Sequence, residues 1–593
     1  MTSSMVKDIG PGPYPHEAPS SRYPVYTRGN AGEVWPEVAY PLSITMSRTV
    51  PDPIMETIVS TGLLTRDEVS EGTTCGGGCF GGYMYLNLSL NRVIAVRSPG
   101  VSIEDSDAIY MGSEGIAPPH DPHPDDKSLR ASFNAIRYMI GILRTKELPE
   151  LATDLAMVRR EGERVPHLMT ADDDTLLAEL RRRIGVVMAL FNRHIEVTGK
   201  AGAAVQYLSQ FCEKQLDDRA LALTLISGIG DVSSAAPSWG LWDLGRIVAE
   251  DPVLTGAFDE GVLGLADRLT ATPEAGDFND AFERFLGEFG SRGPNEWESA
   301  CDTWGTKPEL ALALIDRMRG ADERQAPGAR AQELSGDRER LIAETRARVS
   351  RLRRGTFDNA VRVASLFSVS RERTKTTVID MIHQSRLLTM ELGQRVARRT
   401  GGEWNDIYFC LAEELDDFLA DPEAFDEVIA QRRATREALS SRVPPFVFEG
   451  EMPPFETWEL RDDAVNTADA LAVGESISGL SAVTGVAEGR ACVVTDPFEP
   501  GDLGPGDVLV APLTDPAWTP LFIPAEAVVV DVGGQMSHAV IVAREFGMPC
   551  VVAATDATKR IPNGARIRVD GDTGTVTLLD DSGNSENSSE SGD

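Results

Sequence analysis

Long apolar runs are missing from this sequence of 593 residues. A helix that crosses a membrane needs about 18 or more consecutive apolar residues, and no stretch reaches that length. The opening residues MTSSMVKDIG also lack the apolar core of a signal peptide. The seven cysteines are few and odd in number, which suits reduced thiols. We therefore expect a cytoplasmic protein without a membrane span.

Basic residues are scarce relative to acidic ones. The chain has 57 Lys and Arg residues against 92 Asp and Glu residues, which gives a formal net charge of −35. Nucleic acids and anionic lipids are themselves negatively charged, so a protein with this charge repels them. We therefore expect neither nucleic acid nor a membrane among its partners.

Complete sets of metal ligands are also missing. Cys75 and Cys79 form a C-G-G-G-C pair that could bind a metal or become oxidised. No second close pair of cysteines and no neighbouring histidine completes a zinc site. The sequence therefore predicts no metal site.

The pattern of apolar residues changes once along the chain, and its length already predicts at least two domains. Apolar residues recur every three or four positions in stretches such as Thr175–Phe191 and Val378–Val396, which indicates helices. From about residue 475, short runs of β-branched residues alternate with Gly and Pro turns. We predict a multidomain α plus α/β protein with these parts: a flexible N-terminal arm (1–24), a mostly helical domain (25–441), a Pro-rich linker (442–476), an α/β domain (477–580) and a disordered acidic tail (581–593).

Residues 528–552 predict a strand, a turn and a helix. Gly533 and Gly534 allow a turn after a Val-rich strand, and Ser537 is a good N-cap for a helix that begins at His538. His538 then lies at the positive end of the helix dipole. That position disfavours the imidazolium form and would stabilise a phosphoryl group attached to the ring.

A lone histidine at a helix start is more often a capping or packing residue, so its surroundings decide between the two interpretations. The string Gly-Gly-x-x-Ser-His-x-x-Ile-x-Ala-Arg-Glu-x-Gly-x-Pro, from Gly533 to Pro549, resembles the phosphohistidine signature of the PEP-utilising enzymes. The resemblance extends over residues 477–580 and implies a β/β/α phosphohistidine swivelling domain. It also implies that His538 accepts the phosphoryl group and that Gly533, Gly534 and Ser537 stabilise it.

Two groups of charged residues in the helical region could act on a phosphoryl group. Arg371 and Lys375 are four residues apart and share one face of a helix, so they could clamp a transferring phosphoryl group. Two cations at this spacing are usually ordinary surface charge. Arg292 and Glu296 lie in a loop rich in Gly and Pro, where they could form a polar site or an ion pair that holds two helices together.

Both groups resemble the acceptor-binding domain of rifampin phosphotransferase-like members of the family. Those proteins have a Gly-His-Arg-Gly-Pro-x-Glu string and an Arg-Glu-x-x-Lys string in the same order; here Ser291 replaces the histidine. The string at residues 30–34, Asn-Ala-Gly-Glu-Val, resembles the start of that domain. The resemblance implies that Glu372 could take the acceptor's proton. It also implies catalytic roles for Arg371, Glu372 and Lys375 beside the phosphoryl group and substrate-binding roles for Arg292 and Glu296.

The sequence shows no nucleotide site that could supply the phosphoryl group. No G-x-x-x-x-G-K-[ST] loop is present, and the Gly-rich run at residues 76–82 lacks the lysine of such a loop. Neither the ATP-grasp domain nor the PEP barrel of the family is recognisable. The layout resembles the phosphohistidine subunit of phenylphosphate synthase. By that resemblance, we expect a separate ATP-grasp subunit that binds ATP and Mg²⁺ and loads His538.

These expectations describe a phosphotransferase subunit whose acceptor is a hydroxyl group on a small, aromatic or otherwise apolar molecule. A phosphocarrier or regulatory protein that passes phosphate to another protein is an alternative, as is phosphotransfer linked to PEP. A binding protein that has lost catalysis is a further one. The large helical region favours the enzyme, because a carrier needs no substrate domain.

Overall fold

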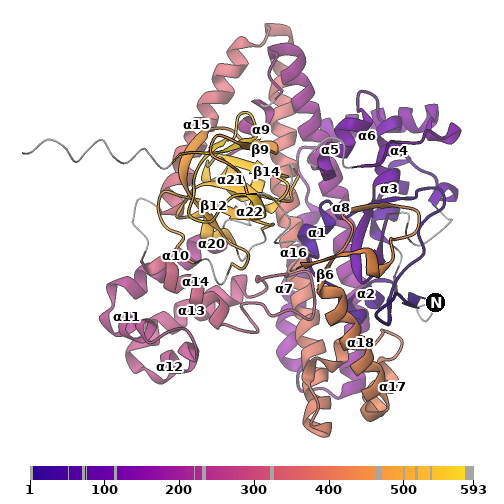
Figure 1. Ribbon diagram of the computed structural model, residues 1–593, viewed down its shortest axis with the longest axis vertical. Helices are drawn as coiled ribbons and strands as arrows, with labels where there is room; N and C mark the ends of the chain where they lie inside the picture. The colour runs from indigo at the N-terminus through magenta and orange to yellow at the C-terminus, as the bar shows by residue number, and fades with distance from the viewer. Residues whose placement is uncertain are drawn as a thin grey trace, which may run out of the picture.

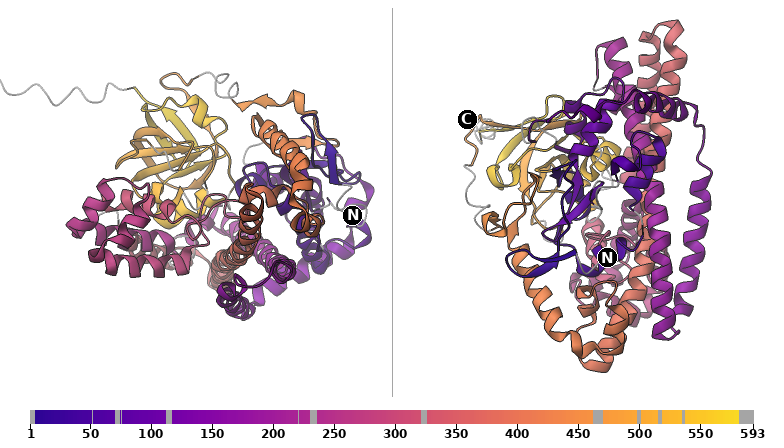
Figure 2. Two further views of the ribbon diagram at one scale, coloured as in Figure 1. Left: turned by 90° about the horizontal axis from the view of Figure 1, so that it is seen from below. Right: turned by 90° about the vertical axis from the view of Figure 1, so that its right-hand side faces the viewer.

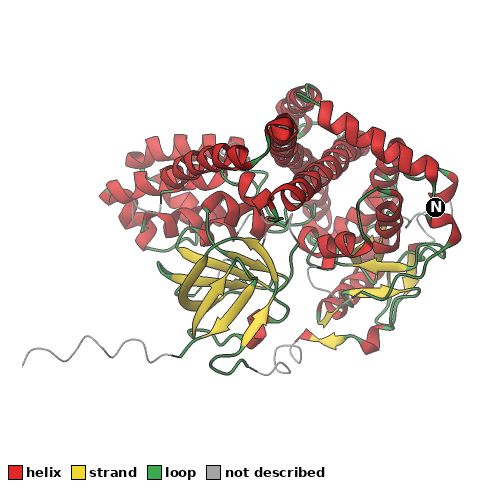
Figure 3. Cartoon of the chain, turned by 90° about the horizontal axis from the view of Figure 1, so that it is seen from above, coloured by secondary structure: helices red, strands yellow, loops and turns green. Residues whose placement is uncertain are grey.

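The computed structural model describes residues 5–50, 52–69, 74, 76–111, 117–219, 221–229, 236–320, 326–461, 470–497, 501–514, 518–534 and 537–580. Helices form most of it, and two groups of strands lie on one side of the long helices (Figure 3). This confirms the predicted multidomain α plus α/β class. No helix in the described part of the chain is both long and apolar enough to cross a lipid bilayer.

Two long helices form the centre of the helical region. They are α8 (Asp173–Leu216) and α16 (Arg354–Thr400), which pack along each other, with α7 (Glu150–Leu168) against α16 (Figure 1). Asp172 caps the start of α8 through its side chain, and Gly401 ends α16 with a φ of 79°. Both stretches that show helical periodicity in the sequence lie inside this pair.

Shorter helices surround the α8–α16 pair. They are α1 (Ala31–Val34), α2 (Pro41–Ser47), α3 (Pro53–Thr61), α4 (Leu88–Arg97), α5 (Ile103–Met111), α6 (Leu129–Arg144), α9 (Leu221–Leu225), α15 (Pro327–Arg348), α17 (Leu415–Ala420) and α18 (Asp426–Ser440). Short 3-10 helices are η2 (Asp67–Val69), η3 (Pro124–Asp126), η4 (Pro273–Ala275), η6 (Arg351–Arg353), η7 (Trp404–Phe409), η8 (Pro422–Phe425) and η9 (Phe455–Thr457).

A four-stranded antiparallel sheet joins segments that are far apart in the sequence. Its order is β4-β5-β3-β7. β3 (Val25–Thr27) pairs with β5 (Tyr83–Asn87) on one side and with β7 (Val447–Glu449) on the other, and β4 (Gly77–Phe80) completes the edge. The beginning and the end of the helical region are therefore held together as one unit.

The N-terminal arm expected over residues 1–24 is folded rather than flexible from residue 5 onward. β1 (Val6–Asp8) pairs with β2 (Pro13–Pro15), and Tyr14 is fully buried. The hydroxyl of Tyr14 donates to the carbonyl of Ala39 at 2.9 Å. The prediction of a mobile arm was wrong because the Gly and Pro residues form turns between segments whose aromatic side chains pack against the core.

The linker expected over residues 442–476 is also largely folded onto its neighbours. β6 (Arg442–Val443) pairs with β8 (Glu459–Leu460) beside the N-terminal sheet. At the other end, the N–H of Gly474 donates to the carbonyl of Leu578 in the C-terminal sheet at 2.8 Å. The connection between these attached parts, residues 462–469, lies outside the described residues.

The C-terminal domain is built on an eight-stranded mixed sheet of order β10-β14-β13-β12-β11-β15-β16-β9. Its four central strands are parallel, and the outer pairs are antiparallel. Its elements are β9 (Ser476–Ser478), β10 (Leu480–Val483), β11 (Val486–Val493), β12 (Asp507–Ala511), α20 (Thr519–Phe522), β13 (Ala525–Val530), α21 (His538–Phe546), β14 (Cys550–Val552), α22 (Ala557–Arg560), β15 (Arg566–Asp570) and β16 (Thr575–Leu578). The predicted acidic tail at residues 581–593 lies outside the described residues.

A small helical bundle lies next to this sheet (Figure 2). It consists of α10 (Ala236–Glu250), α11 (Pro252–Asp259), α12 (Leu265–Ala271), α13 (Gly276–Phe289) and α14 (Glu309–Arg319). Its apolar side chains and those of the sheet form one continuous core. The guanidinium of Arg317 also donates to the carbonyl of Pro497 at 2.6 Å. The C-terminal domain is therefore docked against the helical region.

Gly393 provides a test of how tightly α16 packs. A Cβ atom at this position would lie 2.1 Å from the carbonyl oxygen of Trp404. We expect Gly393→Ala to lower the free energy of unfolding by about 1–3 kcal/mol through overpacking. The matched control is Gly185→Ala on α8, where a Cβ meets no atom within 4 Å. That change is expected to stabilise the helix by up to about 1 kcal/mol, and urea unfolding followed by circular dichroism measures both. Equal effects at the two sites would contradict the packing described.

Candidate active site

The helix that carries His538 begins and ends where the sequence predicts. Ser537 adopts extended backbone angles, and its hydroxyl accepts the N–H of Val540 at 3.4 Å. Gly547 ends the helix with a φ of 61°. Gly533 does not have the positive φ that a glycine turn often needs, so another feature accounts for the glycine at this position. A Cβ there would lie 3.2 Å from the hydroxyl oxygen of Ser537, so the glycine allows the strand end to approach the helix start closely.

Both ring nitrogens of His538 face hydroxyl groups. Nδ1 lies 3.0 Å from Oγ1 of Thr514, and Nε2 lies 3.2 Å from Oγ1 of Thr519. The ring of Phe522 meets the imidazole edge-on, with 6.2 Å between the ring centroids. Burial, together with the charges of Lys375 and Arg292, holds the pKa of His538 well below its usual value. The ring is therefore neutral at physiological pH and keeps one nitrogen lone pair for nucleophilic attack.

The three charged residues expected on α16 lie in the same region as His538. Arg371 forms an ion pair with Glu372, whose side chain is 6% exposed. The ammonium nitrogen of Lys375 lies 3.2 Å from Oε1 of Glu296. The positive charge of Lys375 also acts on the His538 ring. The fold thus brings together residues separated by more than 160 positions in the sequence.

Arg292 and Glu296 form a buried ion pair that fixes their loop to α16. Nη1 of Arg292 lies 3.1 Å from Oε1 of Glu296, and Nη2 donates to Oγ1 of Thr376 at 2.7 Å. Glu296 contributes to the wall of the cavity described below, whereas Arg292 lies behind that wall. Ser291, which replaces the histidine of the related string, donates to Oδ1 of Asp380 at 2.6 Å. Of the two roles that the sequence left open, the structure shows the ion pair, and substrate binding by Arg292 and Glu296 stays a prediction.

Removal of the Glu296 carboxylate should destabilise the protein. Glu296 is 1% exposed, and its loss leaves the buried charges of Arg292 and Lys375 without their shared partner. We expect Glu296→Ala to lower the free energy of unfolding by about 3–5 kcal/mol. Glu288→Ala, at an exposed position nearby, should change it by about 0.5 kcal/mol or less. Urea denaturation measures the free energy of unfolding of the two variants. An unchanged value in Glu296→Ala would show that the protein does not need the ion pair for its stability.

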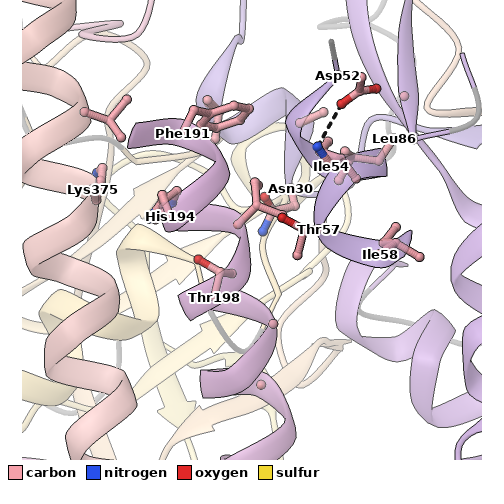
Figure 4. Close-up of a pocket in the computed structure, with 18 of the residues that line it drawn as sticks. Asn30, Asp52, Ile54, Thr57, Ile58, Leu86, Phe191, His194, Thr198 and Lys375 are labelled. Carbon is pink, nitrogen blue, oxygen red and sulfur yellow. Dashed lines mark hydrogen bonds between the residues drawn. The ribbon is translucent and has the colours of Figure 1, made fainter. Parts of the chain in front are cut away.

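A large cavity, with a volume of about 890 Å³, reaches His538. Side chains from α3, α4, α6 and α8 line it on the side away from His538, and most of them are aliphatic or aromatic. In Figure 4, Asn30 and Thr57 lie between α8 and α3, and His194 extends from α8 on the side that faces Lys375 of α16. At the α6 side, Ile136 is 47% exposed, which indicates that the apolar lining continues toward solvent.

Four rings form an aromatic wall in this cavity. The centroids of Trp35 and Trp297 are 5.8 Å apart, and those of Phe191 and Trp297 are 5.7 Å apart. The imidazole of His194 lies 6.0 Å from Trp297. Such a wall offers large apolar contact area to a ring system. No sequence pattern predicts this wall, because its residues come from three separate segments.

His194 is a second neutral histidine that the sequence did not single out. Its Nδ1 lies 3.0 Å from Oγ1 of Thr374, whose hydroxyl donates to the carbonyl of Arg371. Nδ1 must therefore carry the hydrogen, and Nε2 has the lone pair. Burial and the nearby cations Arg371 and Lys375 lower the pKa of His194 to about 3. It can orient a hydroxyl group in the cavity as a hydrogen-bond acceptor.

Glu33 on α1 is a further titratable group beside His538. Burial raises the pKa of its carboxyl group to about 7, against the opposing effects of Arg371 and of the backbone N–H groups of Gly534 and His538. The sequence marked Glu33 only as part of a string that resembles the start of the domain. Its position beside α21 depends on packing between segments about 500 residues apart.

The carboxylates around His538 do not fit a Mg²⁺ site. Glu372 and Glu296 are already paired with Arg371, Arg292 and Lys375. No group of three or more metal-ligating side chains is found within the described residues. Of the C-G-G-G-C pair, Cys75 lies outside the described residues. Cys79 is fully buried, and burial raises the pKa of its thiol.

Two parts of the chain match known protein families. Residues 193–373 match the fourth domain of rifampicin phosphotransferase, and residues 503–574 match the mobile domain of the PEP-utilising enzymes. The first match runs from α8 to α16 and includes Arg371. The second includes His538 and four of the eight strands of the C-terminal sheet, β12 to β15.

The chain is similar to several named transferases. A rifampicin phosphotransferase of a Streptomyces species is 29% identical over 434 residues, which cover 68% of this chain and 48% of that protein. The prodigiosin synthesizing transferase PigC of Serratia marcescens is 26% identical over 520 residues, which cover 84% of this chain and 57% of PigC. A rifampicin phosphotransferase of Bacillus cereus is 29% identical over 321 residues, with 34% of its length covered. The chain thus spans about half or less of the length of most of these relatives. These matches confirm the resemblance stated from the sequence: residues 503–574 are similar to the mobile domain of the PEP-utilising enzymes, and residues 193–373 to the fourth domain of rifampicin phosphotransferase.

Proposed function

We propose that this chain is a phosphotransferase component that carries a phosphoryl group on His538 and transfers it to a hydroxyl group of a small, aromatic or otherwise apolar acceptor. The observation that carries the proposal is the position of His538 beside a cavity of about 890 Å³ that also contains Arg371, Glu372 and Lys375. The residue that would carry the phosphoryl group and the cations that would bind it therefore line the same cavity, which is large enough for a small-molecule acceptor.

The residues suit the transfer step. The acceptor oxygen attacks phosphorus in line with the bond to the His538 nitrogen, and the ring leaves as neutral imidazole. Lys375 and Arg371 neutralise the charge that spreads over the phosphoryl oxygens in the transition state. The hydrogen on the ring nitrogen that does not carry phosphorus stays in place during the transfer, so the ring leaves as neutral imidazole rather than as its anion.

Loading of His538 requires a different position of the C-terminal domain. In the docked position, the ring faces the acceptor cavity and is enclosed by Thr514, Thr519 and Phe522. We propose that the domain undocks to receive the phosphoryl group from ATP on an ATP-grasp subunit that also binds Mg²⁺.

The cavity supports the proposed class of acceptor. The aromatic wall of Trp35, Trp297 and Phe191 would hold a ring system, while Nε2 of His194 would orient its hydroxyl group. A phosphocarrier or regulatory protein would need no cavity of this volume beside its phosphohistidine. The cavity therefore favours the enzyme over that alternative, and PEP-linked loading stays open as a different source of the phosphoryl group.

Labelled ATP tests the loading step. The full chain is incubated with Mg²⁺ and ATP labelled at the β-phosphate, with and without lysate of its source organism. We expect acid-labile label on the chain that depends on the lysate, because the lysate supplies the ATP-grasp subunit. Label without lysate would contradict the need for a separate subunit. Label from PEP in place of ATP would contradict ATP as the donor.

A further inference from the structure

The hydroxyl group of the acceptor must lose a proton when it is phosphorylated, and the structure offers two carboxylates near His538 for that role. Glu372 is the residue that the family string suggests. Its Oε1 is bound by Nη1 of Arg371, and the side chain is 6% exposed. That oxygen is occupied by the guanidinium, and the buried pair leaves little room for a substrate hydroxyl group. Glu372 is therefore better suited to holding Arg371 in place.

Glu33 has the geometry that Glu372 lacks. It belongs to the wall of the cavity that contains His538. Its Oε1 is buried and has no hydrogen-bond partner within the part of the chain that the structure describes. The backbone N–H groups of Gly534 and His538 act on the same carboxyl group as donors. One end of the carboxylate is thus tied to the phosphohistidine helix, while the other has a lone pair to offer to a ligand.

The turn that carries Glu33 is held rigidly. Asn30 precedes α1 with a φ of 65°, a conformation that asparagine tolerates better than most residues. The guanidinium of Arg28 donates to the carbonyls of Trp35 and Pro36 at 3.0 Å and 3.1 Å. Gly32 leaves room for this guanidinium, because a Cβ there would lie 3.3 Å from its Nη2. Three features of the turn therefore serve to place the Glu33 side chain.

We propose that Glu33 is the general base of the transfer step, a role that rests on the proposed function. The acceptor O–H bond breaks and its proton moves to the Glu33 carboxylate. The acceptor oxygen forms a bond to phosphorus as the P–N bond breaks. The electron pair of the P–N bond returns to the His538 ring nitrogen, and the hydrogen on the other ring nitrogen stays in place. No further reactant is needed.

The electrostatics support this assignment. Burial raises the pKa of Glu33 to about 7, and the charged or titratable groups that face it are Arg371 and Lys375 of α16 and His538 of α21. A general base works best when its pKa lies near the working pH. Because Glu33 must be ionised to accept a proton, its contribution should be present above about pH 7 and lost as the pH falls below that value.

The test uses the full chain with His538 phosphorylated by phosphoramidate, so that no partner is needed. Discharge of phosphohistidine is followed by ³¹P NMR in water alone and with 2-naphthol as a hydroxyl probe. The ratio of the wild-type rate to the Glu33→Gln rate cancels the intrinsic pH dependence of phosphohistidine. We expect a ratio of about 10² at about pH 8.5 that approaches 1 at about pH 6.

Two variants serve as controls, and a third decides between the carboxylates. Glu37→Gln changes an exposed carboxylate four residues away and should leave the rate and its pH profile unchanged. Glu33→Asp should keep the pH dependence at a reduced rate, which a purely structural role would not predict. A Glu33→Gln profile that matches wild type would overturn the proposal, as would a loss of the pH dependence in Glu372→Gln alone. Failure of 2-naphthol to accelerate discharge would count against the proposed acceptor class, and the water measurement would still decide the role of Glu33.

Discussion

A chain in which His538 is replaced by alanine is expected to take up no acid-labile phosphate and to show no transfer. The imidazole is the group that would form the P–N bond, and its neutral form is favoured by burial in the docked position. The loss should be complete, because no other histidine lies at the start of α21. Label bound after incubation with β-labelled ATP and lysate measures it. His167→Ala, at an exposed position on α7, should load as wild type does.

The same variant should remain folded, with looser packing inside the C-terminal domain. The ring packs against Phe522 and contacts Thr514 and Thr519. Its removal leaves a gap within the C-terminal domain rather than at a solvent-facing surface. Normal loading of the alanine variant would mean that another residue carries the phosphoryl group.

Replacement of Lys375 by methionine is expected to slow delivery of the phosphoryl group by about 10²- to 10³-fold. The ammonium group of Lys375 acts on the His538 ring and would neutralise the phosphoryl oxygens in the transition state. Loading should change little, since it takes place with the C-terminal domain undocked. Rates of the two half-reactions, measured separately by rapid quench, show the difference.

Two comparisons make the result for Lys375 interpretable. Lys307→Met removes an exposed ammonium group and should leave both half-reactions unchanged. The ion pair of Glu296 with Arg292 is retained when Lys375 is lost, so the loop is expected to stay in place. An equal loss of loading and delivery in Lys375→Met would contradict a role specific to the docked state.

The C-terminal site could be predicted largely from the sequence because its signals are local. The start of α21 at His538, its cap at Ser537 and its end at Gly547 follow from residues within a few positions of one another. Such signals need no knowledge of the remaining chain. The need for glycine at position 533 could not be predicted in this way. It depends on how closely the end of the strand approaches Ser537 at the start of the helix.

The cavity beside His538 and the position of Glu33 could not be predicted in this way. Glu33, His194 and His538 line one cavity although they come from α1, α8 and α21, and no pattern in the sequence encodes that arrangement. The folded N-terminal segment was missed for the same reason. Gly and Pro residues indicate turns, but whether the segments between them pack depends on partners such as the carbonyl of Ala39, which receives the hydroxyl of Tyr14.

One measurement tests the central claim most directly. The chain carrying labelled phosphate on His538 is mixed with a small-molecule extract of its source organism, and the label is followed from protein to product in a single turnover. We predict that the label leaves His538 and appears as an acid-stable phosphate ester of a small apolar compound, at a rate reduced in Lys375→Met. Label that stays on the chain, or that passes to protein whether or not the extract is present, would contradict the account.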